Sequence, residues 1–198
     1  IAGLLSIKEG NIIFKDDISL SSDVRHRTKA QLRGIQLIFQ NPDESLNPSH
    51  TVEEILSQPL KLYFGLSGIK LKNNIIDLLK KVRLSEKYLY RYPRQLSGGE
   101  KQRIAVARAF AAKPDLILCD EVTSALDVSV QAAVLKLLQD LKNELGTTYI
   151  FVSHDLAVVR AISDRVAVLY QGRLCEIGSS SAVYKYPSHP YTEVLLGA

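Results

Sequence analysis

The sequence predicts an α/β fold with a parallel-sheet core and an inserted α-helical subdomain over residues about 43–113. Two observations predict this fold. Short apolar runs typical of buried strands alternate with segments of helical periodicity, as they do in parallel-sheet proteins. The stretch from about residue 43 to about residue 113 is mainly helical and interrupts that alternation. The chain has 198 residues, so we expect one domain over residues 1–198 that buries a proper core.

The first half of the chain has one predicted strand followed by two predicted helices. GIQLIFQ (34–40) is a short apolar run that ends in Gln and precedes a turn-rich stretch. Thr51 and Glu54 have the spacing of a capping box, which predicts a helix to about Leu62. A second helix is predicted over about residues 72–84. Its apolar residues at helical spacing predict one buried face, made of Ile75, Ile76, Leu79 and Val82.

Strands and helices alternate in the second half of the chain. A helix begins near Glu100 and is ended by Pro114. The continuous apolar run DLILC (115–119) predicts a fully buried strand. The elements that follow are a long amphipathic helix (130–145), a β-branched and aromatic strand (147–152), a short helix (156–162) and two strands (165–178) around the turn Gln171–Gly172.

Charge and cysteine usage narrow the class of protein. The formal net charge is +4, and part of the excess lies in residues 23–33. We interpret that stretch as a solvated helix face, with contact to phosphates or nucleic acid as the alternative. The sequence has no basic groove with interleaved aromatic residues, so we expect no nucleic-acid partner. Cys119 and Cys175 lack metal-ligand spacing, and Cys119 falls in an apolar run, so we expect a buried thiol and no disulfide framework.

The ends of the sequence suggest a fragment. No apolar stretch approaches the roughly 18 residues that span a bilayer. Residues 1–7 (IAGLLSI) are interpreted as the tail of a helix that begins upstream, and the 198 residues contain no Met.

Polar residues follow three of the predicted strands. Asp120 and Glu121 come directly after one of them, at the edge where ligands bind in open α/β sheets. Two adjacent acids there can divide the work, one holding Mg²⁺ and the other activating a water, although a helix-capping acid pair is the alternative. His154 and Gln40 end two further runs, and either residue alone is weak evidence because each is often structural.

The residues Ser97, Gly98 and Gly99 precede a predicted helix. The first turn of a helix presents unpaired N–H groups and a partial positive charge, and glycines let the backbone approach an anion closely. This pattern predicts a phosphate-binding helix N-terminus. A glycine-containing loop with a Ser cap is the alternative.

Taken together, these segments resemble the nucleotide-binding domains of ABC transporters over essentially the whole chain. LSGGEKQR (96–103) resembles the signature motif of that family and LILCDE (116–121) its Walker B motif. SALD (124–127) resembles its D-loop, IFQ (38–40) its Q-loop and VSHD (152–155) its switch-histidine segment. The resemblance implies a P-loop NTPase-like (RecA-like) core that binds ATP and Mg²⁺.

The resemblance also implies a role for each matching residue. Asp120 and Gln40 would bind Mg²⁺, and Gln40 would report the nucleotide state to a membrane partner. Glu121 would be the general base for the attacking water, and His154 would bind the γ-phosphate. Residues 97–99 would reach the nucleotide held by a second ATP-binding subunit, in a homodimer or heterodimer.

Two further features of the resemblance matter for function. Asp127, in the D-loop segment, is expected at the nucleotide-binding site. The Walker A loop of the family, G-x-x-x-x-G-K-[ST], is absent from these 198 residues, and IAGLL resembles the end of the helix that follows it. We therefore expect the chain as given to bind ATP poorly. Arg83 stands where relatives often have Gly.

Two segments resemble one subfamily, the ATPases of oligopeptide, dipeptide and nickel importers. They are QNPDESLNPSHTVEEIL (40–56) and YPSHPYTEVLLGA (186–198), in which we interpret His189 as a turn residue and not as a metal ligand. The resemblance implies transmembrane permease subunits, an extracytoplasmic solute-binding protein reached indirectly, and a location at the cytoplasmic face of the membrane through the permease.

Four alternatives belong to the same superfamily or fold. They are a chromosome-maintenance or DNA-repair ATPase, a translation-factor ATPase, a soluble accessory protein of phosphonate breakdown and a catalytically incomplete subunit. The DNA-repair class interrupts its domain with long coiled coils, which the 57 residues from Gln40 to Ser97 (97 − 40) do not accommodate. The phosphonate-related protein shares the importer-like motifs and stays open.

Overall fold

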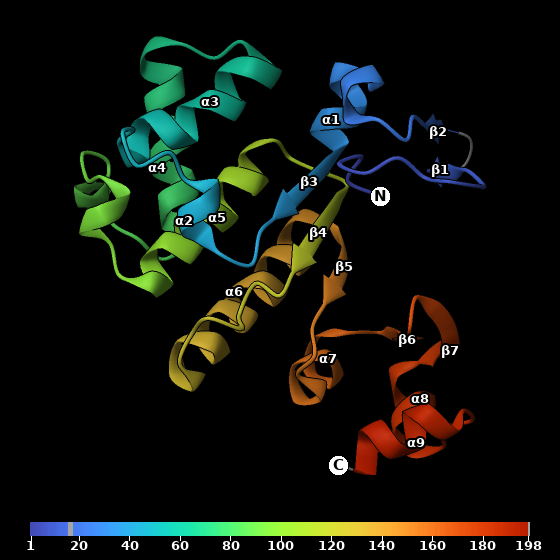
Figure 1. The fold of residues 1–198 in the computed structure, drawn as a ribbon. Helices are drawn as coiled ribbons and strands as arrows, with labels where there is room; N and C mark the ends of the chain where they lie inside the picture. The colour runs from blue at the N-terminus through green and yellow to red at the C-terminus, as the bar shows by residue number, and fades with distance from the viewer. Residues whose placement is uncertain (16–17, 198) are drawn as a thin grey trace. The chain divides into compact units, whose positions relative to one another are not determined.

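The computed structural model describes residues 1–15 and 18–197 (Figure 1). The chain forms two compact units, residues 1–152 and residues 153–198. Among the described residues, no helix combines the length and the apolar character needed to cross a membrane.

A three-stranded parallel sheet is the centre of the first unit. Its strands are β3 (Ile35–Ile38), β4 (Leu116–Asp120) and β5 (Thr148–Val152), in the order β3-β4-β5. Ile38 pairs with Cys119, and Asp120 pairs with Val152. The predicted parallel strands are therefore confirmed, and their carboxyl ends lie at one edge of the sheet.

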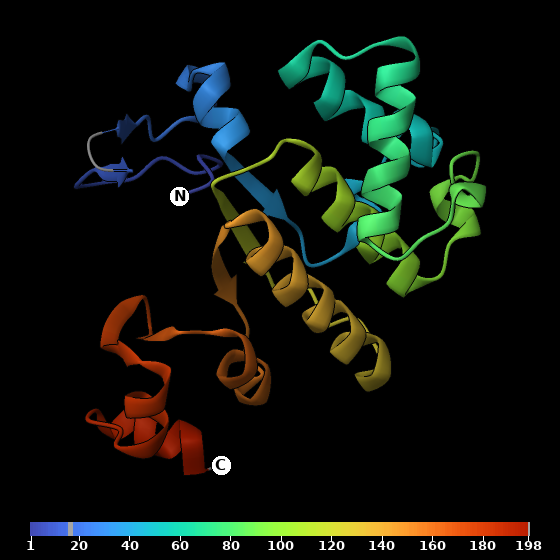
Figure 2. The same ribbon diagram turned by 180° about the vertical axis from the view of Figure 1, so that it is seen from behind.

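One face of the sheet is covered by two long helices, α5 (Gly98–Ala111) and α6 (Val128–Leu145), and α6 runs beside the strands in both ribbon views (Figures 1 and 2). The Phe110 ring lies edge-on to Tyr149 of β5 at 6.4 Å, and the Tyr149 hydroxyl donates a hydrogen bond to the carbonyl oxygen of Leu138 at 2.8 Å. Four apolar residues of α6 are buried: Val134, Leu137, Leu138 and Leu141. This face holds Cys119, a residue that is 1% exposed, as expected, and burial raises the pKa of its thiol to about 12.

The opposite face carries a smaller apolar cluster. Leu20, Ile35, Leu116 and Leu118 are buried together there. Leu20 belongs to a two-stranded antiparallel ribbon formed by β1 (Ile12–Phe14) and β2 (Ile18–Leu20). Alternation along each strand thus sends neighbouring side chains to two different packing layers.

A helical region joins β3 to β4. Its helices are α2 (Pro42–Ser45), α3 (Val52–Phe64), α4 (Gly68–Lys81) and α5, with the short turns η2 (Glu86–Tyr88) and η3 (Pro93–Gln95). The capping box of Thr51 and Glu54 is present, and Gly65 ends α3 in the left-handed conformation, with φ of 64°.

The structure corrects the prediction for α4, the helix expected over about residues 72–84. α4 begins at Gly68 and ends at Lys81, several residues earlier at each end than predicted. Ile75, Leu79 and Val82 are buried, but Ile76 is only half-buried and Leu78 takes the fourth buried place. The buried face follows the turns of α3 and α5 that contact α4, which periodicity alone does not locate.

The amino-terminal part departs from the prediction more clearly. Residues 1–11 form neither helix nor strand, so the expectation of a helical tail is wrong in this structure. An apolar composition alone does not offset the free-energy cost of nucleating a helix. The basic stretch forms η1 (Val24–His26) and α1 (Lys29–Gly34). Most of it is at least partly exposed, but Arg27 is buried and its guanidinium donates to the carbonyl oxygens of Ser21 and Ile1.

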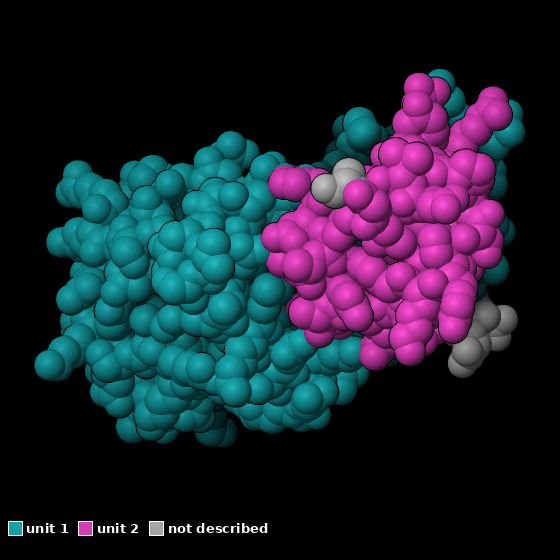
Figure 3. Space-filling view, turned by 90° about the horizontal axis from the view of Figure 1, so that it is seen from below, with its two compact units in different colours: residues 1–152 teal, residues 153–198 magenta. Residues whose placement is uncertain are grey.

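The second unit (Figure 3) is built around an antiparallel strand pair. β6 (Arg165–Tyr170) and β7 (Arg173–Ser179) flank the predicted turn, in which Gln171 and Gly172 have φ of 46° and 76°. Positive φ at both central residues is the geometry that matches the twist of a tight hairpin. The helices of this unit are α7 (Leu156–Ile162), α8 (Ser180–Lys185) and α9 (Pro190–Gly197).

Candidate functional site

Polar residues gather at the carboxyl edge of the parallel sheet, where the sequence predicts them. Gln40 follows β3 by two residues, and Asp120 is the last residue of β4. Both side chains are exposed, although the four preceding residues of β4 are buried. Each buried strand therefore delivers one polar group to solvent at the same edge.

Direct hydrogen bonds join Gln40 to the residues after β4. Its amide nitrogen Nε2 donates to Glu121 Oε2 at 2.9 Å and to Ser124 Oγ at 3.2 Å. The Ser124 hydroxyl donates in turn to the Glu121 carbonyl oxygen at 3.0 Å. Residues 81 positions apart in the chain thus form one hydrogen-bonded group, which holds the Glu121 carboxylate at the sheet edge.

The backbone of Glu121 is strained. Its φ is 46°, in the left-handed region that costs a non-glycine residue about 1–2 kcal/mol. The Glu121 N–H donates to the carbonyl oxygen of Val152 at 3.0 Å, and the Ser124 N–H donates to the Glu121 carbonyl oxygen at 3.0 Å. These bonds hold the conformation that turns the chain sharply out of β4, and strain of this kind is concentrated at functional sites in proteins.

The edge offers the donor set that Mg²⁺ prefers. Asp120 contributes an exposed carboxylate, and the Gln40 amide keeps its oxygen for a cation while its nitrogen donates to Glu121. The described residues contain no cluster of three or more His, Cys, Asp or Glu side chains that would enclose a metal alone. One carboxylate with one neutral oxygen suits a Mg²⁺ ion that shares its remaining positions with water and phosphate.

A second group of polar residues surrounds the amino terminus of α5. Ser97 is the N-cap, so the helix begins at Gly98, two residues before the predicted start. Ser97 Oγ accepts the N–H of Glu100 at 3.3 Å, and Glu100 Oε2 accepts the N–H of Ser97 at 2.8 Å. The exposed Gly98 and the half-buried Gly99 occupy the first turn, whose N–H groups have no acceptor within the helix.

Glu100 is fixed from two sides. The Tyr88 hydroxyl donates to Glu100 Oε1, and the Ser97 N–H donates to the other oxygen. These bonds, the one from Tyr88 first, hold the pKa of Glu100 below its ordinary value of 4.5. A charged carboxylate is stable at a helix amino terminus, so it strengthens the cap beside the glycines.

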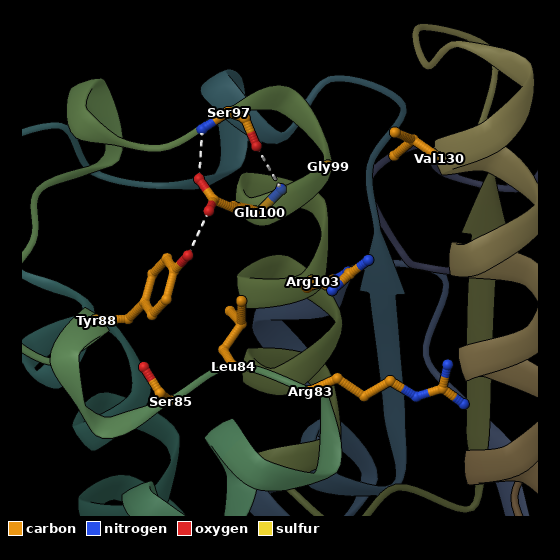
Figure 4. Close-up of a pocket in the computed structure, with 9 residues that line it drawn as sticks. All are labelled: Arg83, Leu84, Ser85, Tyr88, Ser97, Gly99, Glu100, Arg103 and Val130. Atoms are coloured by element: carbon orange, nitrogen blue, oxygen red, sulfur yellow. Dashed lines mark hydrogen bonds between the residues drawn. The ribbon is translucent and has the colours of Figure 1, made fainter.

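A hollow of about 450 Å³ opens beside this helix terminus (Figure 4). In the close-up, Tyr88 and Ser97 both point toward Glu100, and Val130 of α6 lies beyond Gly99. The lining residues are Arg83, Leu84, Ser85, Tyr88, Ser97, Gly99, Glu100, Arg103 and Val130. Arg83 has φ of 59°, and its guanidinium donates to Asp140 Oδ2 at 2.6 Å.

Two further residues are predicted at the site, Asp127 and His154. Asp127 is the N-cap of α6, where Oδ1 accepts the N–H of Val130 at 3.0 Å and the hydroxyl of Ser129 at 2.7 Å. These bonds, the one from Ser129 first, lower the pKa of Asp127. His154 belongs to the second unit and is an exposed residue between β5 and α7, followed by Asp155 as the N-cap of that helix.

The structure thus brings Gln40 together with Glu121 in one hydrogen-bonded group and Ser97 with Glu100 in another. The residues that sequence reasoning missed are Ser124 and Tyr88. Ser124 lies three residues after Glu121, a spacing typical of a turn that folds back on its first residue. Tyr88 has no local signal, because its contact with Glu100 depends on how η2 packs against α5.

Comparisons with known proteins show the family of the chain. The family model described as ABC transporter matches residues 1–124. The chain is 44% identical over 199 residues to the oligopeptide transport ATP-binding protein OppF of Haemophilus influenzae, covering 100% of this chain and 60% of that protein. It is 44% identical over 191 residues to the dipeptide transport ATP-binding protein DppF of the same organism, covering 96% of this chain and 58% of that protein.

A solved structure shows the same fold. The ATP-binding cassette MJ0796, in a dimeric post-hydrolysis state bound to ADP and Pi, superimposes with a TM-score of 0.75 and 32% identity. The match covers 91% of this chain and 77% of that chain. The α/β core is therefore P-loop NTPase-like, as predicted. The chain spans about 60% of the length of the curated relatives it matches. The match to the family model over residues 1–124 shows that this chain belongs to the ABC transporter family.

Proposed function

We propose that this chain is part of an ATP-binding subunit that hydrolyses ATP to power an importer of oligopeptides, dipeptides or related small solutes. The observation that carries the proposal is the hydrogen bond of 2.9 Å between Gln40 Nε2 and Glu121 Oε2 beside Asp120. It supports the proposal because it joins Gln40, a candidate cation ligand, to Glu121, a candidate general base. The names of the relatives support the peptide class, and they give no support to a role in phosphonate breakdown.

The residues at the sheet edge would share the work of phosphoryl transfer to water. Asp120 and the Gln40 amide oxygen would hold Mg²⁺, which neutralises the charge of the nucleotide phosphates. The Glu121 carboxylate would take the proton of the attacking water, and the Gln40 amide would orient that carboxylate. General-base catalysis of this kind contributes about 10²–10⁴-fold to a rate.

The remaining residues would complete the site. His154 would donate a hydrogen bond to a phosphoryl oxygen, and Asp127 would contact the nucleotide site. Ser97, Gly98 and Gly99 would bind the nucleotide held by a second ATP-binding subunit, because the first turn of α5 offers N–H groups to an anion. Catalysis would then require two subunits to close on each other.

The proposal includes an assembly with other subunits. We place the subunit at the cytoplasmic face of the membrane, attached through transmembrane permease subunits that receive solute from an extracytoplasmic binding protein. The second ATP-binding subunit is a copy of the same chain or a related one.

The test uses the full-length protein assembled with its permease in lipid nanodiscs. Glu121→Gln should lower the ATP turnover rate about 100-fold or more while ATP still binds, because only the base is lost. The variant should therefore accumulate as an ATP-bound dimer, measured by size-exclusion chromatography with labelled nucleotide. Glu144→Gln on α6, a carboxyl of the same type away from the sheet edge, is the matched control and should retain turnover. Equal turnover in the Glu121→Gln variant and the unsubstituted protein would contradict the assignment.

A further inference from the structure

The short helix α2 follows Gln40 in the chain and contacts α5. It begins two residues after Gln40, and Asn41 is its N-cap, with Oδ1 accepting the Asp43 N–H at 3.0 Å. With only Asn41 and Pro42 between Gln40 and Asp43, a displacement of α2 is transmitted to Gln40. Gln40 in turn donates to the Glu121 carboxylate.

An ion pair fastens α2 to the first turn of α5. Asp43 Oδ1 and Lys101 Nζ are 2.6 Å apart. Lys101 belongs to the turn that Ser97 caps, since its N–H donates to the Ser97 carbonyl oxygen at 2.9 Å. The Lys101 side chain is 17% exposed and the Asp43 side chain 58% exposed. The lysine is therefore largely withdrawn from water, and its charge interacts more strongly with Asp43 than a fully solvated one would.

A second contact holds the other end of the same helix. Arg108, two turns further along α5, donates from Nη1 to the Ser45 carbonyl oxygen. The helix that presents Ser97 to a nucleotide thus holds α2 at both of its ends. A path therefore runs from the Ser97 turn through the Lys101–Asp43 ion pair, along the two intervening backbone residues to Gln40, and through its hydrogen bond to Glu121.

We propose that the Asp43–Lys101 ion pair is a positioning link that sets the Gln40 amide against Glu121 according to the position of the α5 amino terminus. This inference rests on the proposed ATPase function and adds two positioning residues to it. Under this proposal, neither Asp43 nor Lys101 touches the reacting atoms. The link acts through Gln40, so its loss should lower the rate of the chemical step more than it weakens ATP binding.

The experiment measures ATP turnover by the full-length protein with its partner subunits, in the variants Asp43→Asn, Lys101→Gln and both together. Each single variant should lower kcat about fivefold, the factor that corresponds to about 1 kcal/mol for one ion pair. KM for ATP should change less than about twofold. The double variant should be no slower than either single variant, because the two residues act as one unit.

Two further sets of variants separate positioning from general stability. Lys81→Gln and Glu144→Gln break a similar ion pair, between α4 and α6, which contacts neither α2 nor Gln40; both should retain kcat. In a Gln40→Ala background, Asp43→Asn should have no further effect on kcat. The exchanged pair Asp43→Lys with Lys101→Asp should recover most of the rate, and urea unfolding should show that each variant is folded.

The outcomes are distinct. Three results would overturn the positioning link while leaving the ATPase assignment in place. The first is that the decreases in kcat of the two single variants add in the double variant, and the second is that Lys81→Gln lowers kcat as much as they do. The third is that Asp43→Asn still lowers kcat fully in the Gln40→Ala background. Absence of ATP turnover in the unsubstituted complex would instead overturn the proposed function, and the link with it.

Discussion

At the scale of single residues, the adjacent glycines Gly98 and Gly99 differ in how much space each has for a side chain. A Cβ atom added at Gly99 would lie 2.5 Å from Val130 Cγ1, well inside van der Waals contact. A Cβ atom added at Gly98 would lie 3.8 Å from Leu126 Cδ2, an ordinary contact. The lack of a side chain at Gly99 is therefore needed for α5 and α6 to approach each other. At Gly98 it is needed only if a ligand approaches the backbone.

Gly99→Ala should lower the free energy of unfolding by about 1–3 kcal/mol, because the added methyl group overpacks the contact with the stiff side chain of Val130. Gly98→Ala is the matched control. It should leave that free energy unchanged or raise it by up to about 1 kcal/mol, because alanine favours a helix. Urea unfolding measures both. Adding Val130→Ala to Gly99→Ala should restore part of the loss, and an equal loss in both glycine variants would exclude the steric explanation.

At the scale of elements, α5 carries most of the site, and its first turn is stabilised by a network that extends beyond its own sequence. The capping box of Ser97 and Glu100 is local, but Tyr88 reaches Glu100 from η2. Because these bonds lower the folded-state pKa of Glu100, they contribute stability that is present above pH 4.5 and is lost as the pH falls through the folded-state pKa.

Glu100→Gln should therefore remove a pH-dependent part of the stability. Glutamine still accepts the Ser97 N–H, so the helix should still form. The difference in unfolding free energy between the unsubstituted chain and the Glu100→Gln variant should be largest near pH 7 and should shrink on acidification below about pH 4.5. Urea unfolding across this pH range measures it. Tyr88→Phe removes the hydrogen bond that lowers the pKa of Glu100 most, so the stability difference between this variant and the unsubstituted chain should also shrink on acidification. Unfolding free energies of variant and unsubstituted chain that run parallel across the pH range would contradict this account.

At the scale of the whole molecule, the two groups of site residues have separate hydrogen-bond partners. Gln40 is bonded to Glu121 and Ser124, whereas Ser97 is bonded to Glu100. The 198 residues also lack a G-x-x-x-x-G-K-[ST] loop, which would supply a lysine and several backbone N–H groups to the phosphates.

The chain of residues 1–198 alone should therefore bind Mg-ATP weakly and show no measurable turnover. A longer form of the protein that contains such a loop should bind Mg-ATP tightly. Isothermal titration and a phosphate-release assay on both forms check this. Turnover by the 198-residue chain at the rate of the longer form would show that residues outside the loop motif can bind the phosphates.

Much of the fold and of the candidate site could be predicted because the signals are local. Apolar runs predict β3, β4 and β5. The capping box of Thr51 and Glu54 predicts the start of α3, and the Ser-Gly-Gly stretch predicts the start of α5 to within two residues. Polar residues directly after strands give the sheet edge, because parallel strands end together. The prediction of a helical tail over residues 1–7 was wrong because it rested on apolar composition without a local helix signal, and composition alone does not nucleate a helix.

By itself the sequence determined the α/β class, the order of the main elements between β3 and β7 and the residue types at the site, because periodicity, caps and motif spacing act over a few residues. Only the tertiary structure decided which partners those residues have. The Gln40 bond to Glu121, the Tyr88 bond to Glu100 and the Asp43 pair with Lys101 join positions 81, 12 and 58 apart in the chain. No local pattern encodes such pairs, because they depend on how strands and helices pack.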